Sequence, residues 1–230
     1  GQWMLCFSEV LNEHGYATMA ATANINIAEQ FLFDQGFDEF YCEEGKSWDW
    51  FNSMVEGFVE GQGLERPVVT YLHVMEPHAP YTPTKTSKDR FDRGFEPSSE
   101  RVGEGLLDFD KIYPEIGPTD AEYYKDLYDA EIHDVDRGFG EFLEMLRKRG
   151  RYENALIIVV SDHGESFGEH DTMQHGFCLN QQESHVPLII KFPYGEMAGQ
   201  RVGSRVSLVD LWPTIMEVTG TNIRPPYVLP

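Results

Sequence analysis

Three short apolar runs, rich in β-branched residues, recur along the chain and limit the folds that it can adopt. They are PVVTYLHVM at 67–75, ALIIVVSD at 155–162 and VPLIIKFP at 186–193. Runs of this length and composition are typical of buried strands. YATMAATAN at 16–24 is a weaker example of the same pattern. The chain is therefore expected to build its core around a sheet.

The segments between these runs have the features of helices. FSEVLNEHG at 7–15 ends in a glycine suited to a left-handed C-terminal cap. Apolar residues recur at helical spacing over 119–150, where Thr119 and Glu122 form a capping box. A last helix is predicted over 210–220, with a proline in its first turn. Helices are thus expected to alternate with the strands.

This alternation predicts an α/β fold with a largely parallel central sheet flanked by helices. Ligands of such sheets bind at the carboxyl ends of the strands. Residues 76–118 are rich in Pro, Gly, Ser and acidic residues, and we expect them to form one long loop excursion rather than a second core. The interpretation is then of a single domain over 1–230.

Charge and cysteine content narrow the class of partner. The 39 acidic residues exceed the 18 basic ones and give a net charge of -21, which disfavours nucleic acid and anionic membranes as partners. No apolar run approaches the roughly 20 residues of a membrane span. The three cysteines lie at irregular spacing without a CxxC pair, which argues against a disulfide framework or a zinc site. Localisation stays open.

Polar residues follow two of the apolar runs at the point where each run ends. His78 follows 67–75, Asp162 ends 155–162, and His163 comes directly after it. An Asp and a His side by side, with a glycine next to them, can direct an oxygen and a nitrogen to one divalent cation. An isolated pair of this kind more often caps a turn, so the interpretation depends on its neighbours.

Further ionisable residues follow Asp162 closely in the sequence. They are Glu165, Glu169, His170 and His175. Together with His78 they are expected to converge at one edge of the sheet. Such a cluster suits an anionic tetrahedral substrate, because a metal and imidazolium groups neutralise charge on the leaving oxygen in the transition state. His73, inside its strand, is expected to pack against the core.

Four ordered motifs resemble the sulfatase branch of the alkaline phosphatase superfamily. They are YLHVMEPHAPY, IIVVSDHGESFGEH, the pair His175 and Gly176 followed by HVPLIIKFP, and SLVDLWPTIMEVTG. Upstream, EVLNEHGYATMAATAN and FLFDQGFDEF resemble the segment that follows the nucleophile in that family. The resemblance implies an alkaline-phosphatase/sulfatase-like fold and a sulfuric ester hydrolase, that is, metal-dependent hydrolysis of a sulfate ester.

The resemblance also implies roles for four residues. Asp162 and His163 match the two metal ligands that the family takes from its SDHG strand end, usually for calcium, magnesium or manganese. His78 matches the His that faces the sulfate or its leaving oxygen. His175 falls where many members place a Lys or His that contacts a sulfate oxygen. His78 and His175 are therefore the predicted catalytic residues.

The nucleophile of the family, a formylglycine in the true sulfatases, is expected upstream of this chain. Cys6, in LCFSEV, lacks the Pro and Arg of the C-x-P-S-R motif. The chain is then interpreted as the C-terminal two thirds of such an enzyme, without its N-terminal strand or strands and inactive or nearly so by itself. A missing strand would expose a sheet edge, which predicts self-association.

Two alternatives stay open. The same superfamily includes phosphodiester and phosphonate hydrolases and phosphoglycerol or phosphoethanolamine transferases, which share the SDHG strand end. The second alternative is a non-catalytic truncated module that binds an anion or a partner protein. Against it, clustered carboxylate and imidazole groups are hard to explain by a structural role alone. In either enzyme the substrate is a small-molecule sulfate or phosphate ester.

Overall fold

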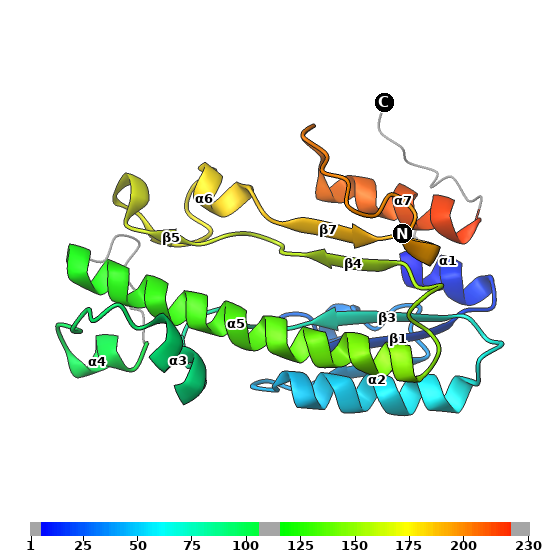
Figure 1. Ribbon diagram of the computed structural model, residues 1–230. Coiled ribbons are helices and arrows are strands. Elements are labelled where there is room, and N and C mark those ends of the chain that lie inside the picture. The colour runs from blue at the N-terminus through cyan, green and yellow to red at the C-terminus, as the bar shows by residue number, and fades with distance from the viewer. Residues whose placement is uncertain (1–5, 106–115, 222–230) are drawn as a thin grey trace. The chain divides into compact units, whose positions relative to one another are not determined.

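The computed structural model describes residues 6–105 and 116–221 (Figure 1). The chain divides into two compact units. Unit 1 comprises Gly1–Met75, Leu143–Leu156 and Phe192–Pro230, and unit 2 comprises Glu76–Phe142 and Ile157–Lys191. The single domain expected from the sequence stays a prediction.

Unit 1 has a sheet of three parallel strands in the order β2-β1-β3. The strands are β1 (Ala17–Thr22), β2 (Glu39–Cys42) and β3 (Val68–His73). All six residues of the central strand β1 are buried. Alanines at half of its positions let helices pack closely on both faces.

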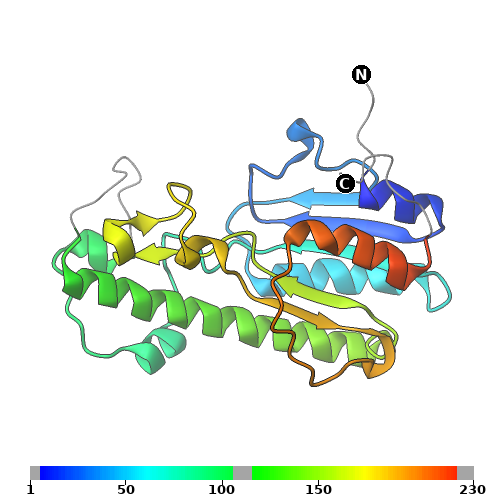
Figure 2. The same cartoon turned by 90° about the horizontal axis from the view of Figure 1, so that it is seen from above.

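Three α-helices cover the sheet of unit 1. They are α1 (Phe7–Glu13), α2 (Trp48–Gln62) and α7 (Leu211–Thr219). Figures 1 and 2 show α1 and α7 on one face and α2 on the other. Val10 and Leu11 of α1 are fully buried and pack with Met216 of α7 in one apolar cluster. Three short 3-10 helices complete the unit: η1 (Glu29–Phe31), η3 (Pro193–Gly195) and η4 (Leu208–Asp210).

Unit 2 contains most of the long helix α5 (Pro118–Lys148) and two antiparallel strand pairs. The pairs are β4 (Ile157–Val160) with β7 (Leu188–Lys191), and β5 (Ser166–Phe167) with β6 (Met173–Gln174). The short helices are α3 (Lys85–Phe91), α4 (Glu100–Gly103), α6 (Gln181–Ser184) and η2 (Glu169–Asp171). Tyr81, Tyr124, Leu127, Phe167 and Met173 form the core between α5 and the β5-β6 pair.

The predicted α/β organisation is confirmed, with three differences. The sheet of unit 1 is parallel as expected, but β4 pairs with β7 in the antiparallel direction. The long helix begins at Pro118, one residue before the predicted capping box, because proline suits the first helical turn. The region 76–118 was expected to be one irregular excursion, yet it includes α3 and α4; its residues 106–115 lie outside the described part.

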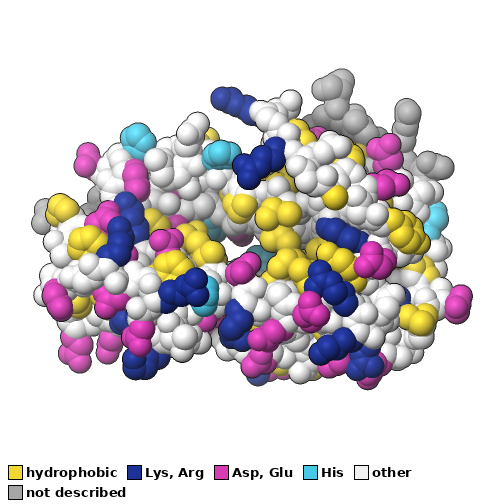
Figure 3. Space-filling view, in the orientation of Figure 1, with side chains coloured by type: hydrophobic (Ala, Val, Ile, Leu, Met, Phe, Trp, Pro, Cys, Tyr) yellow, Lys and Arg dark blue, Asp and Glu magenta, His cyan; other side chains and the backbone are white. Residues whose placement is uncertain are grey.

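Acidic side chains do not gather in one block on the face that Figure 3 shows. Figure 3 shows them scattered over the visible face with Lys and Arg among them. Several form ion pairs, including Glu141 with Arg137 on α5 at 2.8 Å. Within the two described ranges, no helix is long and apolar enough to cross a bilayer.

Candidate active site

The SDHG turn follows β4 in unit 2 and is held by its own hydrogen bonds. The Ser161 hydroxyl donates to the His163 carbonyl at 2.5 Å, and the His163 N–H donates to Oδ1 of Asp162 at 2.9 Å. The Gly164 N–H donates to the Glu183 carbonyl at 2.7 Å. These bonds fix the backbone beside both predicted metal ligands.

Gly164 is required by this close approach. A Cβ atom at this position would lie 2.0 Å from the carbonyl oxygen of Gln182, a distance that no real Cβ contact allows. The backbone of the turn therefore passes directly against the segment that leads into β7. Glycine is needed in SDHG because of this close packing and not because the backbone has a positive φ.

We expect Gly164→Ala to destabilise the protein by about 1–3 kcal/mol, because the added methyl group overpacks the turn. The matched control is Gly140→Ala in α5, where a Cβ meets no atom within 4 Å. Alanine there should stabilise the helix by up to about 1 kcal/mol. Urea unfolding of the two variants checks both values; equal stabilities would contradict the contact with Gln182.

Asp162 and His163 present one oxygen and one nitrogen to the same region. The His163 Nδ1 lies 2.9 Å from the Gly164 carbonyl, which can only accept, so this nitrogen is the protonated one. Nε2 then has the lone pair and lies 3.7 Å from Oδ1 of Asp162. Both side chains are accessible, with 39% of His163 and 66% of Asp162 exposed. The pair therefore fits as two ligands of a hard divalent cation.

Three imidazole rings, one of them that of His163, lie together at this turn. The rings of His163 and His175 stack with their centroids 3.9 Å apart, and the centroids of His78 and His175 lie 5.2 Å apart at a steep angle. The His78 Nδ1 lies 2.6 Å from the Ala79 carbonyl, which again leaves Nε2 with the lone pair in the neutral ring. The structure thus brings together all four residues predicted from the sequence.

Comparison with known proteins shows the family of this chain. The sulfatase family model matches residues 1–221. The chain belongs to the sulfatase family. The uncharacterized sulfatase YidJ of Escherichia coli (strain K12) is 27% identical over 186 residues, which are 78% of this chain and 36% of that protein. Arylsulfatase K of Bos taurus is 30% identical over 184 residues, which are 70% of this chain and 33% of that protein.

Solved structures show the same sulfatase-like fold. BT4656 in complex with its substrate D-glucosamine-2-N,6-O-disulfate has a TM-score of 0.74 at 19% identity, over 96% of this chain and 62% of that one. The phosphonate monoester hydrolase of Agrobacterium radiobacter has a TM-score of 0.71 at 17% identity, over 93% and 57%. This sulfatase chain spans about a third of the length of the curated relatives it matches.

Two buried carboxylates support the imidazole cluster of the sulfatase chain. Glu165 accepts from the Tyr81 hydroxyl and bonds the His175 Nδ1, both at 3.0 Å. Glu183 accepts from the Gly176 N–H at 2.9 Å and the Cys178 thiol at 2.7 Å. Burial would raise the pKa of Glu183, but these donors outweigh it and lower the pKa overall. The bond with Glu165 raises the pKa of His175 although burial opposes it.

Other residues that the sequence suggested are engaged elsewhere. Glu169 forms an ion pair with Lys125 at 3.2 Å, and His170 is exposed. His73 was expected to pack against the core, but it is half-buried at the end of β3, with its Nε2 3.5 Å from the Asn24 amide nitrogen. Sequence reasoning did not predict the supporting contacts of Tyr81 and Glu183: Tyr81 meets Glu165 across 84 positions, and Glu183 meets its partners across 5 to 17 positions.

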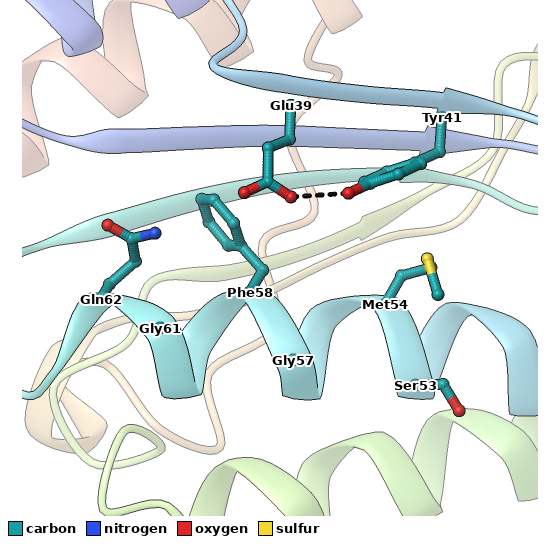
Figure 4. A pocket seen from close by; sticks show the side chains of 8 residues that line it. All are labelled: Glu39, Tyr41, Ser53, Met54, Gly57, Phe58, Gly61 and Gln62. Carbon is teal, nitrogen blue, oxygen red and sulfur yellow. Dashed lines mark hydrogen bonds between the residues drawn. The ribbon is translucent and has the colours of Figure 1, made fainter.

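A shallow pocket of about 200 Å³ lies in unit 1 between β2 and α2 (Figure 4). Figure 4 shows Gly57 and Gly61 on the side of α2 that lines it. The Tyr41 hydroxyl donates to Glu39 in this pocket at 2.7 Å. Its lining, which lies wholly in the described part of unit 1, includes none of the four predicted site residues, so it is not the candidate active site.

Proposed function

We propose that the protein containing this chain hydrolyses a sulfate ester of a small molecule. The observation that supports the proposal is the cluster of three imidazoles beside Asp162 in a chain of the sulfatase family. Sulfate esters are tetrahedral anions, and hydrolysis places further negative charge on the leaving oxygen. Imidazole N–H donors near that oxygen stabilise the transition state more than the ground state.

Within this proposal Asp162 and His163 would hold a divalent cation: calcium, magnesium or manganese. Sulfatases generally use a metal ion together with a formylglycine. The bound cation would polarise a substrate oxygen. Among the described residues no group of three or more His, Cys, Asp or Glu could hold a metal ion, so Asp162 and His163 are proposed as part of a larger ligand set. The formylglycine nucleophile stays a prediction.

His78 and His175 would bind the sulfate group. In each ring Nδ1 is engaged, by the Ala79 carbonyl in His78 and by Glu165 in His175. Nε2 is then the nitrogen with which each ring would contact a substrate oxygen. A protonated His175, favoured by its raised pKa, would donate from Nε2 and add positive charge beside the ester.

Phosphoryl transfer is the second candidate. It is supported by the TM-score of 0.71 with the phosphonate monoester hydrolase, because that fold likeness extends over 93% of this chain. A cation and imidazolium groups stabilise a phosphoryl group by the same charge neutralisation. The sulfate ester is preferred here because the family model and both curated relatives are sulfatases.

A matched set of aryl esters tests the proposal on the full-length protein. We expect kcat/KM for 4-nitrophenyl sulfate to exceed that for 4-nitrophenyl phosphate and for a phenylphosphonate ester. His78→Ala should lower kcat/KM for the sulfate by about 100-fold, since losing one group positioned against the charge of the transition state costs about 3 kcal/mol. His170→Ala, an exposed histidine, is the control.

Each other outcome has a distinct meaning. A higher kcat/KM for the phosphonate would favour the second candidate. If the protein hydrolyses none of the three esters but still binds anions, the non-catalytic module would be favoured. Self-association, predicted from the sequence, is measured separately by analytical ultracentrifugation.

A further inference from the structure

We propose that Glu165 is a positioning residue that fixes the tautomer and orientation of His175 and ties it to the loop of His78. The inference rests on the proposed function, because it concerns how the two substrate-binding imidazoles are held. None of the four residues predicted for the site is proposed to hold the His175 ring in this way. Glu165 acts through its neighbours and is not proposed to touch the substrate.

Both oxygens of Glu165 are used. Oε2 accepts from the Tyr81 hydroxyl at 3.0 Å, and Oε1 lies 3.0 Å from the His175 Nδ1. The Glu165 side chain is only 5% exposed, so water cannot readily replace either partner. A buried carboxylate needs such donors, because an unpaired buried charge is costly.

The Tyr81 end of this network is rigid. Tyr81 is 1% exposed, and its ring lies about 6 Å from the rings of three neighbours: Tyr124 (6.0 Å), Tyr128 (5.9 Å) and Phe167 (6.0 Å). Burial and the nearby Glu165 raise the pKa of Tyr81 strongly, so its hydroxyl keeps its proton and donates. Glu165 is therefore held by a residue of the aromatic core of unit 2. That residue, Tyr81, lies on the same segment as His78.

The His175 end depends on Glu165. The ring is 23% exposed and the backbone beside it is held by the bond from the Gly176 N–H to Glu183. That bond fixes the chain but not the rotation of the ring. The carboxylate selects the Nδ1–H form of His175, since an ionised carboxylate only accepts. Nε2 is then presented to a ligand, in the manner of a histidine oriented by a carboxylate.

Replacing Glu165 by Gln makes the proposal testable. The amide oxygen of Gln can accept from Tyr81, but its NH2 group then faces the His175 Nδ1 and donates to it. Glu165→Gln should thus convert neutral His175 from the Nδ1–H to the Nε2–H tautomer. We also expect kcat/KM to fall about 10- to 100-fold, the usual cost of losing a partner that orients a ligand-binding histidine.

The decisive measurement is the ring nitrogen shifts of ¹⁵N-labelled histidine in the full-length protein, without substrate and at a pH where the ring is neutral. Tyr81→Phe is the matched control, since it removes the other bond to Glu165 and leaves the His175 bond in place. The control should lose a comparable amount of stability, as a purely structural role predicts, but should keep the Nδ1–H tautomer.

Two results would overturn the proposal: an Nε2–H tautomer of His175 in the unaltered protein, or an unchanged tautomer in a Glu165→Gln protein whose amide oxygen still accepts from the Tyr81 hydroxyl. The first needs no variant to fold. Because no substrate is present, the readout is independent of the reaction. A tautomer switch supports the positioning role even if no sulfate ester is hydrolysed, whereas hydrolysis with an unchanged tautomer supports the proposed function and rejects the role of Glu165.

Discussion

Asp162→Asn is expected to lower kcat/KM for a sulfate ester by about 1,000-fold in the full-length protein. A bound cation contributes several kcal/mol to stabilisation of the transition state, and each 1.36 kcal/mol is a factor of ten. The proposed ligand set loses the negative charge of Asp162 in this variant. Oδ1 of Asn still accepts from the His163 N–H, which Asp162 accepts at 2.9 Å, so the turn should keep its fold.

Calorimetric titration with calcium, magnesium and manganese, alongside kinetics, separates loss of metal from loss of structure. We expect Asp162→Asn to weaken binding of the physiological cation with little change in melting temperature, since the side chain is 66% exposed. Asp171→Asn is the matched control, as Asp171 is exposed and its positive φ suits Asn. Wild-type metal affinity and turnover in Asp162→Asn would remove Asp162 from the metal site.

The strands that matter for the site could be predicted because their apolar runs are continuous. The observed β3, β4 and β7 fall within the three predicted runs, and the polar residues behind two of them meet in unit 2 as expected. The strand β2 was missed because EFYC offers only four residues with one acid among them. Short strands of this kind are recognised by their partner, here β1, rather than by their own pattern.

The helix α2 was missed for a different reason. It contains Gly57 and Gly61, and each glycine in a helix interior costs about 1 kcal/mol relative to alanine. Its buried residues, Phe51, Val55, Phe58 and Val59, do recur at helical spacing. Tertiary packing of that apolar face outweighs the weak intrinsic propensity.

The residues that hold the site could not be read from sequence in the same way. Tyr81 and Glu165 lie 84 positions apart, and only the fold brings the hydroxyl to the carboxylate. Glu183 lies 17 positions from Ser166 and 7 from Gly176, and only the folded chain brings these two groups to its carboxylate. The proposed ligands follow a strand end, where local pattern is informative, whereas the residues that support them depend on packing between segments.

A second large effect is expected from a buried carboxylate on α5. Glu131 is 3% exposed, and its Oε1 accepts from the Thr82 N–H at 2.6 Å. Its Oε2 is buried without a hydrogen-bond partner among the described residues. Burial raises the pKa of Glu131 from its ordinary value of 4.5 to about 8, and the nearby Glu76 and Asp134 add to the shift.

The sign of the effect follows from the raised pKa. Below pH 4.5 the carboxyl is protonated in both the folded and the unfolded state, so its contribution to stability is fully present. As the pH rises toward about 8, the unfolded state releases the proton more readily and the folded state is progressively destabilised. Each pH unit in this window costs about 1.4 kcal/mol, so the whole loss is up to roughly 4–5 kcal/mol.

Glu131→Gln should remove this pH dependence, because Gln stays neutral and its oxygen still accepts from Thr82. We expect the free energy of unfolding of the variant to exceed that of the wild type by several kcal/mol at about pH 8.5, and by much less at about pH 5. Urea unfolding at both pH values measures the difference. Glu141→Gln, on an exposed residue of the same helix, is the control and should change the wild-type pH profile little. A constant difference between Glu131→Gln and the wild type at both pH values would contradict the raised pKa. It would mean that Glu131 is already ionised in the folded protein and that a group other than the Thr82 N–H stabilises its charge.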